Sequence, residues 1–265
     1  MSLFCYKAGI YKAYYELGAE LFSGLDRHFR NFINKRHVKE YQIPALLEES
    51  VLKKCGYIDS FPHQLIKIQS AAHQDLKRED LPDPVYYLTP AACLHLYPMI
   101  KEADDTHNVT ITTRARVFRR ETEKRNPEFR LWDFSVREIV FVGGRDYVQA
   151  ALAELEQKAF GFALQVSADA RVEAATDDFY PTQKNKVKKR LQIANKLKRE
   201  LLIPCGWERI AVSSFNYHDT HFSQAFGFDK NNSVVTGCVG FGLERWSAVC
   251  VQHNYNLKEG LVNES

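Results

Sequence analysis

Charged and aromatic side chains stand at even spacings in two neighbouring stretches of the sequence. The first stretch contains Arg119 and Glu121, and the second contains Arg130, Phe134 and Glu138. Alternate residues of a strand project from one face, so two paired strands would present cations, an aromatic ring and carboxylates together. A guanidinium binds phosphate oxygens, and a carboxylate accepts hydrogen bonds from an amine, so this face could hold a nucleotide. The same residues also allow a simpler interpretation, a solvated hairpin with ordinary cross-strand salt bridges.

The segments that contain these residues resemble two motifs of class II aminoacyl-tRNA synthetases. Residues 118–121 and 130–138 resemble motif 2, an aromatic-Arg-x-acidic strand followed, after a loop, by basic-xxx-Phe-xxx-acidic. Residues 237–245 resemble motif 3, in which a glycine-rich strand end leads into a helix with an ATP-binding arginine. Glycines let a ligand approach the backbone closely. The resemblance implies an α+β fold, an antiparallel β-sheet flanked by helices, and activation of an amino acid by ATP.

Finer matches are to the atypical zinc-dependent seryl-tRNA synthetases and their truncated homologues, the amino acid:carrier protein ligases, which lack a tRNA-binding domain. The resemblance covers about residues 50–250 and implies one catalytic domain over residues 1–265. The matching segments are residues 55–57, 60–64, 90–95, 213–218 and 237–238.

The subgroup binds zinc through a cysteine before motif 2, the last glutamate of motif 2 and a cysteine of motif 3. Those positions match Cys93, Glu138 and Cys238. Two thiolates and a carboxylate leave the fourth tetrahedral position of zinc open, where the α-amino group of a substrate could bind. The residues alone favour a different interpretation, because a lone cysteine is usually a small buried hydrophobe. Cys55 is the alternative ligand if Cys93 is not one.

Formation of an adenylate requires cations, because a carboxylate attacks the α-phosphate and pyrophosphate leaves. The resemblance implies that Arg119 holds the α-phosphate and the attacking carboxylate, and that Arg245 holds the γ-phosphate. It also implies that Phe134 stacks on adenine, that Glu121 lies near the adenine amine, and that Arg130 belongs to the ATP-binding face. Mg²⁺ is expected on the phosphates of ATP.

Three further residues precede motif 3 and are candidates for the same site. Glu208 is a candidate for contacts with ATP or its metal ion, and Asn216 and His218 are candidates for contacts with the substrate. The alternatives are hydrogen bonding within a turn for Asn216 and a structural role for His218. His221 is a secondary candidate.

The composition excludes several classes of protein. The chain has 36 Lys and Arg against 33 Asp and Glu, a net charge of +3, which is far below that of a dedicated nucleic-acid binder. No run of about 18 apolar residues and no signal peptide is present, so we expect a soluble, cytoplasmic protein that does not bind membranes. The six cysteines include no CxxC pair, so no disulfide framework is indicated.

The hydrophobic pattern predicts the elements that must position these residues. Helical spacing indicates an amphipathic helix over residues 8–34 and a basic amphipathic helix over residues 182–202. Residues 85–88 indicate a strand that leads into a short helix. The remaining predictions are a hairpin of residues 109–120 and 130–142, a helix over 145–160, strands over 209–215 and 233–239, and a turn into residues 243–249.

The acceptor of the activated amino acid is predicted from the resemblance and from local charge. Carrier proteins are small and acidic and have a phosphopantetheine arm, so the basic helix could be their docking surface rather than an ordinary solvated face. We expect a small α-amino acid as substrate, no tRNA, and a homodimer. The alternatives are a minimal aminoacyl-tRNA synthetase or paralogue that donates to another acceptor, and a non-catalytic regulatory module.

Overall fold

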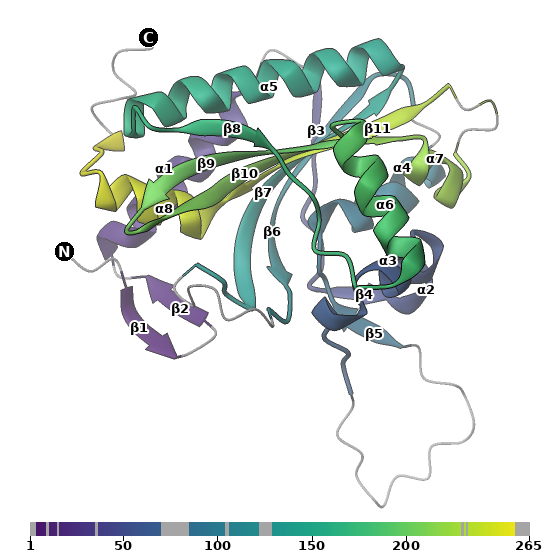
Figure 1. Ribbon diagram of the computed structural model, residues 1–265, viewed down its shortest axis with the longest axis horizontal. Helices are drawn as coiled ribbons and strands as arrows, with labels where there is room; N and C mark the ends of the chain where they lie inside the picture. The colour runs from purple at the N-terminus through teal and green to yellow at the C-terminus, as the bar shows by residue number, and fades with distance from the viewer. Residues whose placement is uncertain are drawn as a thin grey trace, which may run out of the picture.

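A seven-stranded sheet organises the computed structural model, which describes residues 4–8, 11–14, 16–34, 37–69, 85–103, 106–121, 129–228, 231 and 233–257 (Figure 1). Every neighbouring pair in it is antiparallel except β3 and β6. In spatial order the strands are β3 (Val38–Glu40), β6 (Val109–Phe118), β7 (Asp133–Gly143), β11 (Val235–Gly242), β10 (Glu208–Asp219), β9 (Lys198–Cys205) and β8 (Arg171–Ala174). This arrangement confirms the predicted α+β class.

Three helices cover one face of the sheet. They are α1 (Glu16–Asn31), α5 (Arg145–Val166) and α8 (Leu243–Gln252), and Figure 1 shows α5 lying along the sheet. Phe29 of α1 stacks on Phe241 of β11 with ring centroids 4.3 Å apart, and Trp246 of α8 packs beside them. All three side chains are fully buried. This core stabilises the sheet on its helix-covered face, so the candidate site residues can lie on the opposite face.

The second face is covered only in part. The short helices η2 (Ala92–His95), α4 (Leu96–Ala103), α7 (His221–Phe226) and α2 (Glu49–Lys54) pack over one end of it. Tyr97 and Phe222 stack there, with ring centroids 4.1 Å apart. Further segments at the edge of this layer are β4 (Leu46–Glu48), α3 (Tyr57–Ser60), η1 (Pro62–Gln64), β5 (Tyr86–Leu88) and α6 (Gln183–Ala194). A cavity remains between them and the strands.

The predicted hairpin of motif 2 is confirmed, because β6 and β7 pair from Val109–Val142 to Phe118–Asp133. The chain between them includes residues 122–128, which lie outside the described residues. Arg119 continues the ladder for one more bond, since its backbone N–H donates to Trp132 O at 2.9 Å. The two halves of the motif therefore share one surface.

Two predicted helices have other bounds in the structure. The N-terminal helix begins at Glu16 rather than near residue 8, because Tyr11–Tyr14 (β2) pairs with Phe4–Ala8 (β1). Aromatic residues favour strands as readily as helices, so the spacing of apolar residues could not distinguish a strand from a helix over residues 11–14. Among the described residues no helix is long and apolar enough to cross a membrane.

The basic helix ends at Ala194, and Lys198 begins strand β9. Lys196 has φ of +50°, a left-handed conformation that turns the chain away from the helix. The prediction that residues 182–202 form one helix was therefore wrong. Leu201, within the predicted range of the helix, is instead a fully buried residue of strand β9.

Candidate functional site

A cavity of about 920 Å³ opens on the partly covered face of the sheet. Strands β6, β7, β11, β10 and β9 form its floor, and α6 contributes to its wall. Every site residue predicted from the sequence lines it: Cys93, Arg119, Glu121, Arg130, Phe134, Glu138, Glu208, Asn216, His218, Cys238 and Arg245.

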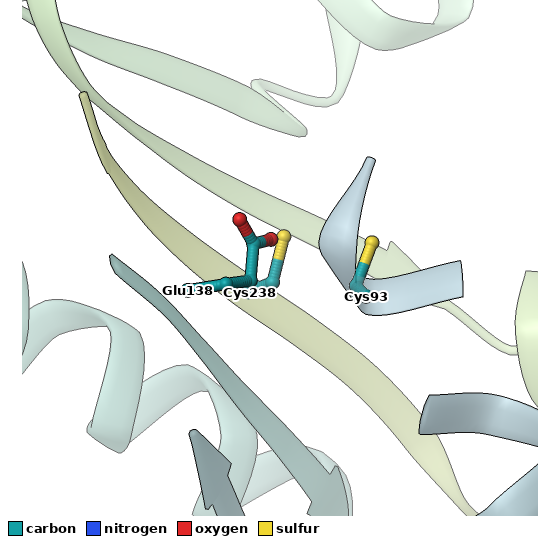
Figure 2. A group of neighbouring side chains, drawn as sticks. All are labelled: Cys93, Glu138 and Cys238. Carbon is teal, nitrogen blue, oxygen red and sulfur yellow. The ribbon is translucent and has the colours of Figure 1, made fainter. Parts of the chain in front are cut away.

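Cys93, Glu138 and Cys238 converge at the inner end of this cavity. One ligand atom from each lies within 4.8 Å of the other two, and all three residues are buried (Figure 2). Glu138 comes from β7, Cys238 from the adjacent β11, and Cys93 from η2 above the strands. Two sulfurs and a carboxylate oxygen this close form a donor set that suits Zn²⁺ with one position left open. Cys55 is outside the group, since its thiol donates to Leu52 O at 3.5 Å.

The protonation of the trio reflects its burial. Burial raises the pKa of the Glu138 carboxyl to about 7, although contacts with Cys238, Arg119 and Cys93 oppose the shift. The Cys238 thiol has a pKa well above its ordinary value because it contacts Cys93, is buried and faces the Glu138 carboxylate. A divalent cation would reverse these preferences, because it stabilises the anionic form of each ligand.

Gly240 makes room for this carboxylate. It lies directly opposite Glu138 in the β7–β11 ladder, and a Cβ atom at this position would stand 3.2 Å from Glu138 Oε2. Any side chain there would press on the ligand. The space needed by the Glu138 carboxylate therefore explains why a glycine occupies position 240, the second glycine of the motif 3 pattern.

Three arginines gather at the outer end of the cavity. Arg119 Nε donates to Pro90 O at 2.7 Å, and its guanidinium lies 5.6 Å from the centroid of Phe134. Arg245 donates to backbone oxygens of Phe129 and Ala211 at 3.0 and 2.9 Å. Burial, followed by the proximity of Arg130, lowers the pKa of Arg245. Partly buried guanidinium groups that repel one another form a natural site for a polyanion.

Glu121 is the carboxylate beside this cluster. Its Oε2 accepts from Arg130 Nη1 at 3.1 Å, and its backbone oxygen accepts from Trp132 Nε1 at 3.2 Å. Phe134 lies beside Arg119 in the same cavity, and Glu208 at the start of β10 also lines the cavity. The outer end thus combines a group of cations with an aromatic ring.

Sequence reasoning missed an ion-pair group on the opposite wall. Lys198 Nζ donates to Asp177 Oδ1 at 2.7 Å and to Glu200 Oε1 at 3.0 Å, and Gln192 of α6 donates to Asp177 Oδ2 at 2.7 Å. Lys198 begins strand β9, which forms part of the cavity floor, whereas the sequence pattern predicted a helix over these residues. The alternation of Lys198, Glu200 and Leu202, all of which line the cavity, was the signal that could have revealed it.

Comparison with known sequences decides the family. No family model matches the chain. The chain is 30% identical over 234 residues to amino acid–acyl-carrier-protein ligase 1 of Bradyrhizobium diazoefficiens, covering 81% of this chain and 71% of that protein. The chain belongs to the amino acid–acyl-carrier-protein ligase family. Ligase 2 of the same organism is 29% identical, and the type-2 serine–tRNA ligase of Methanococcus maripaludis is 25% identical. The present ligase spans 69% of the former and 50% of the latter.

Solved structures agree on the fold of this ligase. A complex of M. kandleri SerRS with A. aeolicus tRNASec superposes with a TM-score of 0.73 at 18% identity, over 95% of this chain and 55% of that one. The Giardia lamblia prolyl-tRNA synthetase in complex with prolyl-adenylate gives 0.69 at 14% identity, over 92% and 48%. The ligase thus has a class II synthetase fold and spans about half the length of these chains.

Glu244 lies beside Arg245 and is itself buried. Both of its carboxylate oxygens accept from the Ser135 backbone N–H, at 2.8 and 2.9 Å. Burial nevertheless raises the pKa of Glu244 to about 7 from an ordinary 4.5. The folded ligase therefore binds a proton here more tightly than the unfolded chain does.

This shift predicts a pH-dependent stability. Because the folded pKa is raised, the contribution of Glu244 is fully present below about pH 4.5 and is lost as the pH rises to about 7. Glu244→Gln should therefore gain stability relative to the wild type across that window, by up to about 1.4 kcal/mol per pH unit. Urea unfolding of both proteins at a series of pH values measures the difference. Parallel curves for the two proteins would contradict the assignment.

Proposed function

We propose that this ligase activates a small α-amino acid with ATP and transfers it to the phosphopantetheine thiol of a carrier protein. The observation that carries the proposal is the convergence of Cys93, Glu138 and Cys238 beside an arginine cluster in a member of this ligase family. The Cys/Glu/Cys group would hold a metal ion that binds an amine, and the arginine cluster would bind a triphosphate. An amino acid bound between them would have its carboxylate directed toward ATP.

In the proposed arrangement Cys93, Glu138 and Cys238 hold Zn²⁺. The ion would supply Lewis acidity for the neutral α-amino group of the substrate, and so select α-amino acids. All three side chains are buried, so little of each is in contact with solvent. Cys238 lies between two strands whose register is fixed on both sides, so the ligands are held before the substrate arrives.

The arginines have separate proposed roles in the adenylation step. Arg119, next to Phe134 and near Glu138, would hold the α-phosphate and the attacking carboxylate. Arg245 would hold the γ-phosphate, while Arg130 and Glu121 would bind elsewhere along ATP, whose adenine would stack on Phe134. The carboxylate attacks the α-phosphorus and pyrophosphate leaves, so negative charge spreads toward these cations. Glu208 would contact the Mg²⁺ that accompanies ATP.

The second step moves the aminoacyl group. The thiol of the arm attacks the carbonyl carbon of the adenylate, a thioester bond forms, and AMP leaves. We propose that the carrier protein docks on α6, which combines exposed apolar and basic side chains beside the cavity. Val187, Leu191 and Ile193 are each more than half exposed on this helix. A small acidic partner matches both the charge and the apolar surface.

The proposed activity has a direct test. ATP–pyrophosphate exchange should depend on one small amino acid from a panel, and the labelled amino acid should then appear on a holo carrier protein as a thioester. Carrier protein without its phosphopantetheine arm is the matched control and should stay unlabelled. Absence of exchange with every amino acid would refute the enzymatic proposal. Exchange followed by transfer only to tRNA would instead support a minimal synthetase related to the serine–tRNA ligases.

The metal assignment predicts the effect of removing one ligand. Cys238→Ala should lose bound Zn²⁺ and lower exchange by more than about 100-fold, since even partners of metal ligands are worth 10–100-fold. Cys250→Ala is the matched control, because Cys250 is equally buried but lies in the core on α8. Elemental analysis of the purified proteins, together with exchange rates, checks both. Full activity of a zinc-free Cys238→Ala protein would refute the assignment.

The docking proposal predicts a defect confined to transfer. Reversing two exposed charges of α6 in the double variant Lys186→Glu, Arg190→Glu should lower kcat/KM for the carrier protein about 10-fold or more at low salt, because steering is lost. The difference should shrink as salt is added. Exchange should not change. Arg27→Glu, at an exposed position of α1 on the other face of the sheet, is the control for charge reversal, and equal losses in both proteins would argue against docking on α6.

A further inference from the structure

Two donor groups of β10 lie against one sulfur of the trio. Asn216 Nδ2 is 3.5 Å from Cys238 Sγ, and His218 Nε2 is also 3.5 Å from it. The sequence had suggested Asn216 and His218 for contacts with the substrate. Their positions against the sulfur suggest that they act on the site through Cys238.

The other ring nitrogen of His218 is also engaged. Nδ1 lies 3.1 Å from Thr236 Oγ1 and 3.3 Å from the hydroxyl of Tyr97. Thr236 and Tyr97 are fully buried. The imidazole also meets Phe222 edge to face, with ring centroids 4.8 Å apart. The ring is therefore fixed in both position and orientation.

These contacts determine where the ring proton sits if Cys238 is a thiolate. A thiolate accepts hydrogen bonds and donates none, so Nε2 must carry the proton. Nδ1 then presents a lone pair, to which the nearer hydroxyl, that of Thr236, donates. The Tyr97 hydroxyl is then available to donate to the sulfur of Cys93, with which it also has a hydrogen bond. One buried network thus places donors on both sulfurs.

Charge explains what such a network accomplishes. Zn²⁺ with two thiolates and one carboxylate has a formal charge of −1, which makes the ion a poor acceptor for a further lone pair. Hydrogen bonds to sulfur withdraw electron density from it, and partners of this kind tune a bound metal. Three donors, from Asn216, His218 and Tyr97, would restore part of the Lewis acidity that the ligands remove.

We propose that His218 is a positioning residue for the metal centre, which donates from Nε2 to Cys238 and limits electron donation by its thiolate so that the site accepts an amine. The inference rests on the proposed function, since it presumes a metal held by the trio. It concerns a different property, the electron density at one sulfur. That property can be measured without substrate.

The test uses the chain of residues 1–265 loaded with Co²⁺, whose sulfur-to-cobalt charge-transfer band reports the electron density at the thiolates. His218→Leu should move this band to lower energy, because the sulfur becomes a stronger donor. His218→Gln places an amide N–H near the position of Nε2 and should restore the band. His221→Leu is the matched control, since His221 lines the same cavity but donates to Cys55 O at 3.1 Å. Its band should match that of the wild type.

A kinetic readout accompanies the spectrum. In His218→Leu the KM for the amino acid in ATP–pyrophosphate exchange should rise about 10-fold, while the KM for ATP stays unchanged. If His218→Leu does not fold, Thr236→Val offers a second route, because the Tyr97 hydroxyl would then turn to Nδ1 and leave Cys93. Its band should shift in the same direction by a smaller amount.

The outcomes separate this inference from the proposed function. Uptake of Co²⁺ by the wild type with a band unmoved in both His218→Leu and Thr236→Val would overturn the role of His218 and leave the proposed metal site intact. Failure of the wild type to bind Co²⁺ or Zn²⁺ would overturn both. A band that moves in His218→Leu but not in His218→Gln is the expected result.

Discussion

The antiparallel register of three central strands is the constraint on which the site depends. In the β7–β11 ladder Glu138 lies opposite Gly240, and in the β11–β10 ladder Cys238 lies opposite Asn216. A shift by one residue in either ladder would turn a ligand or its partner to the helix-covered face. Packing of α1, α5 and α8 against that face, around Phe29 and Trp246, makes such a shift costly because it would expose the core.

The same constraint separates the chemistry into two ends of one cavity. Along β7, alternate residues Phe134 and Glu138 face the cavity, the first among arginines and the second among thiols. Arg137, between them in the sequence, points to the other face and pairs with Asp26 of α1 at 2.7 Å. One strand therefore supplies an aromatic ring of the cavity, the carboxylate of the Cys/Glu/Cys group and an anchor for the supporting layer.

Helix α6 borders the cavity and is packed less closely than the other helices. Helix α6 is held at one side through Lys188, whose Nζ donates to Ser60 Oγ at 2.8 Å, and through Asn185, which donates to Asp59 O at 2.9 Å. Its apolar side chains remain in solvent. An exposed apolar and basic helix costs solubility when unpartnered, so its presence beside the cavity favours a binding role for that surface.

The sequence by itself determined the family resemblance, the motif 2 hairpin and a set of candidate site residues that all line one cavity, because alternation along a strand and a fixed motif spacing are local properties. Without the resemblance, the residue pattern could not place Cys93 against Cys238, since their approach depends on η2 packing over the sheet. It also misplaced Lys198, because the turn at Lys196 and the pairing of β9 with β10 override helical periodicity. Only tertiary structure revealed that His218 and Asn216 face a sulfur, because the cross-strand neighbours of a residue are set by strand order and register, which no local pattern encodes.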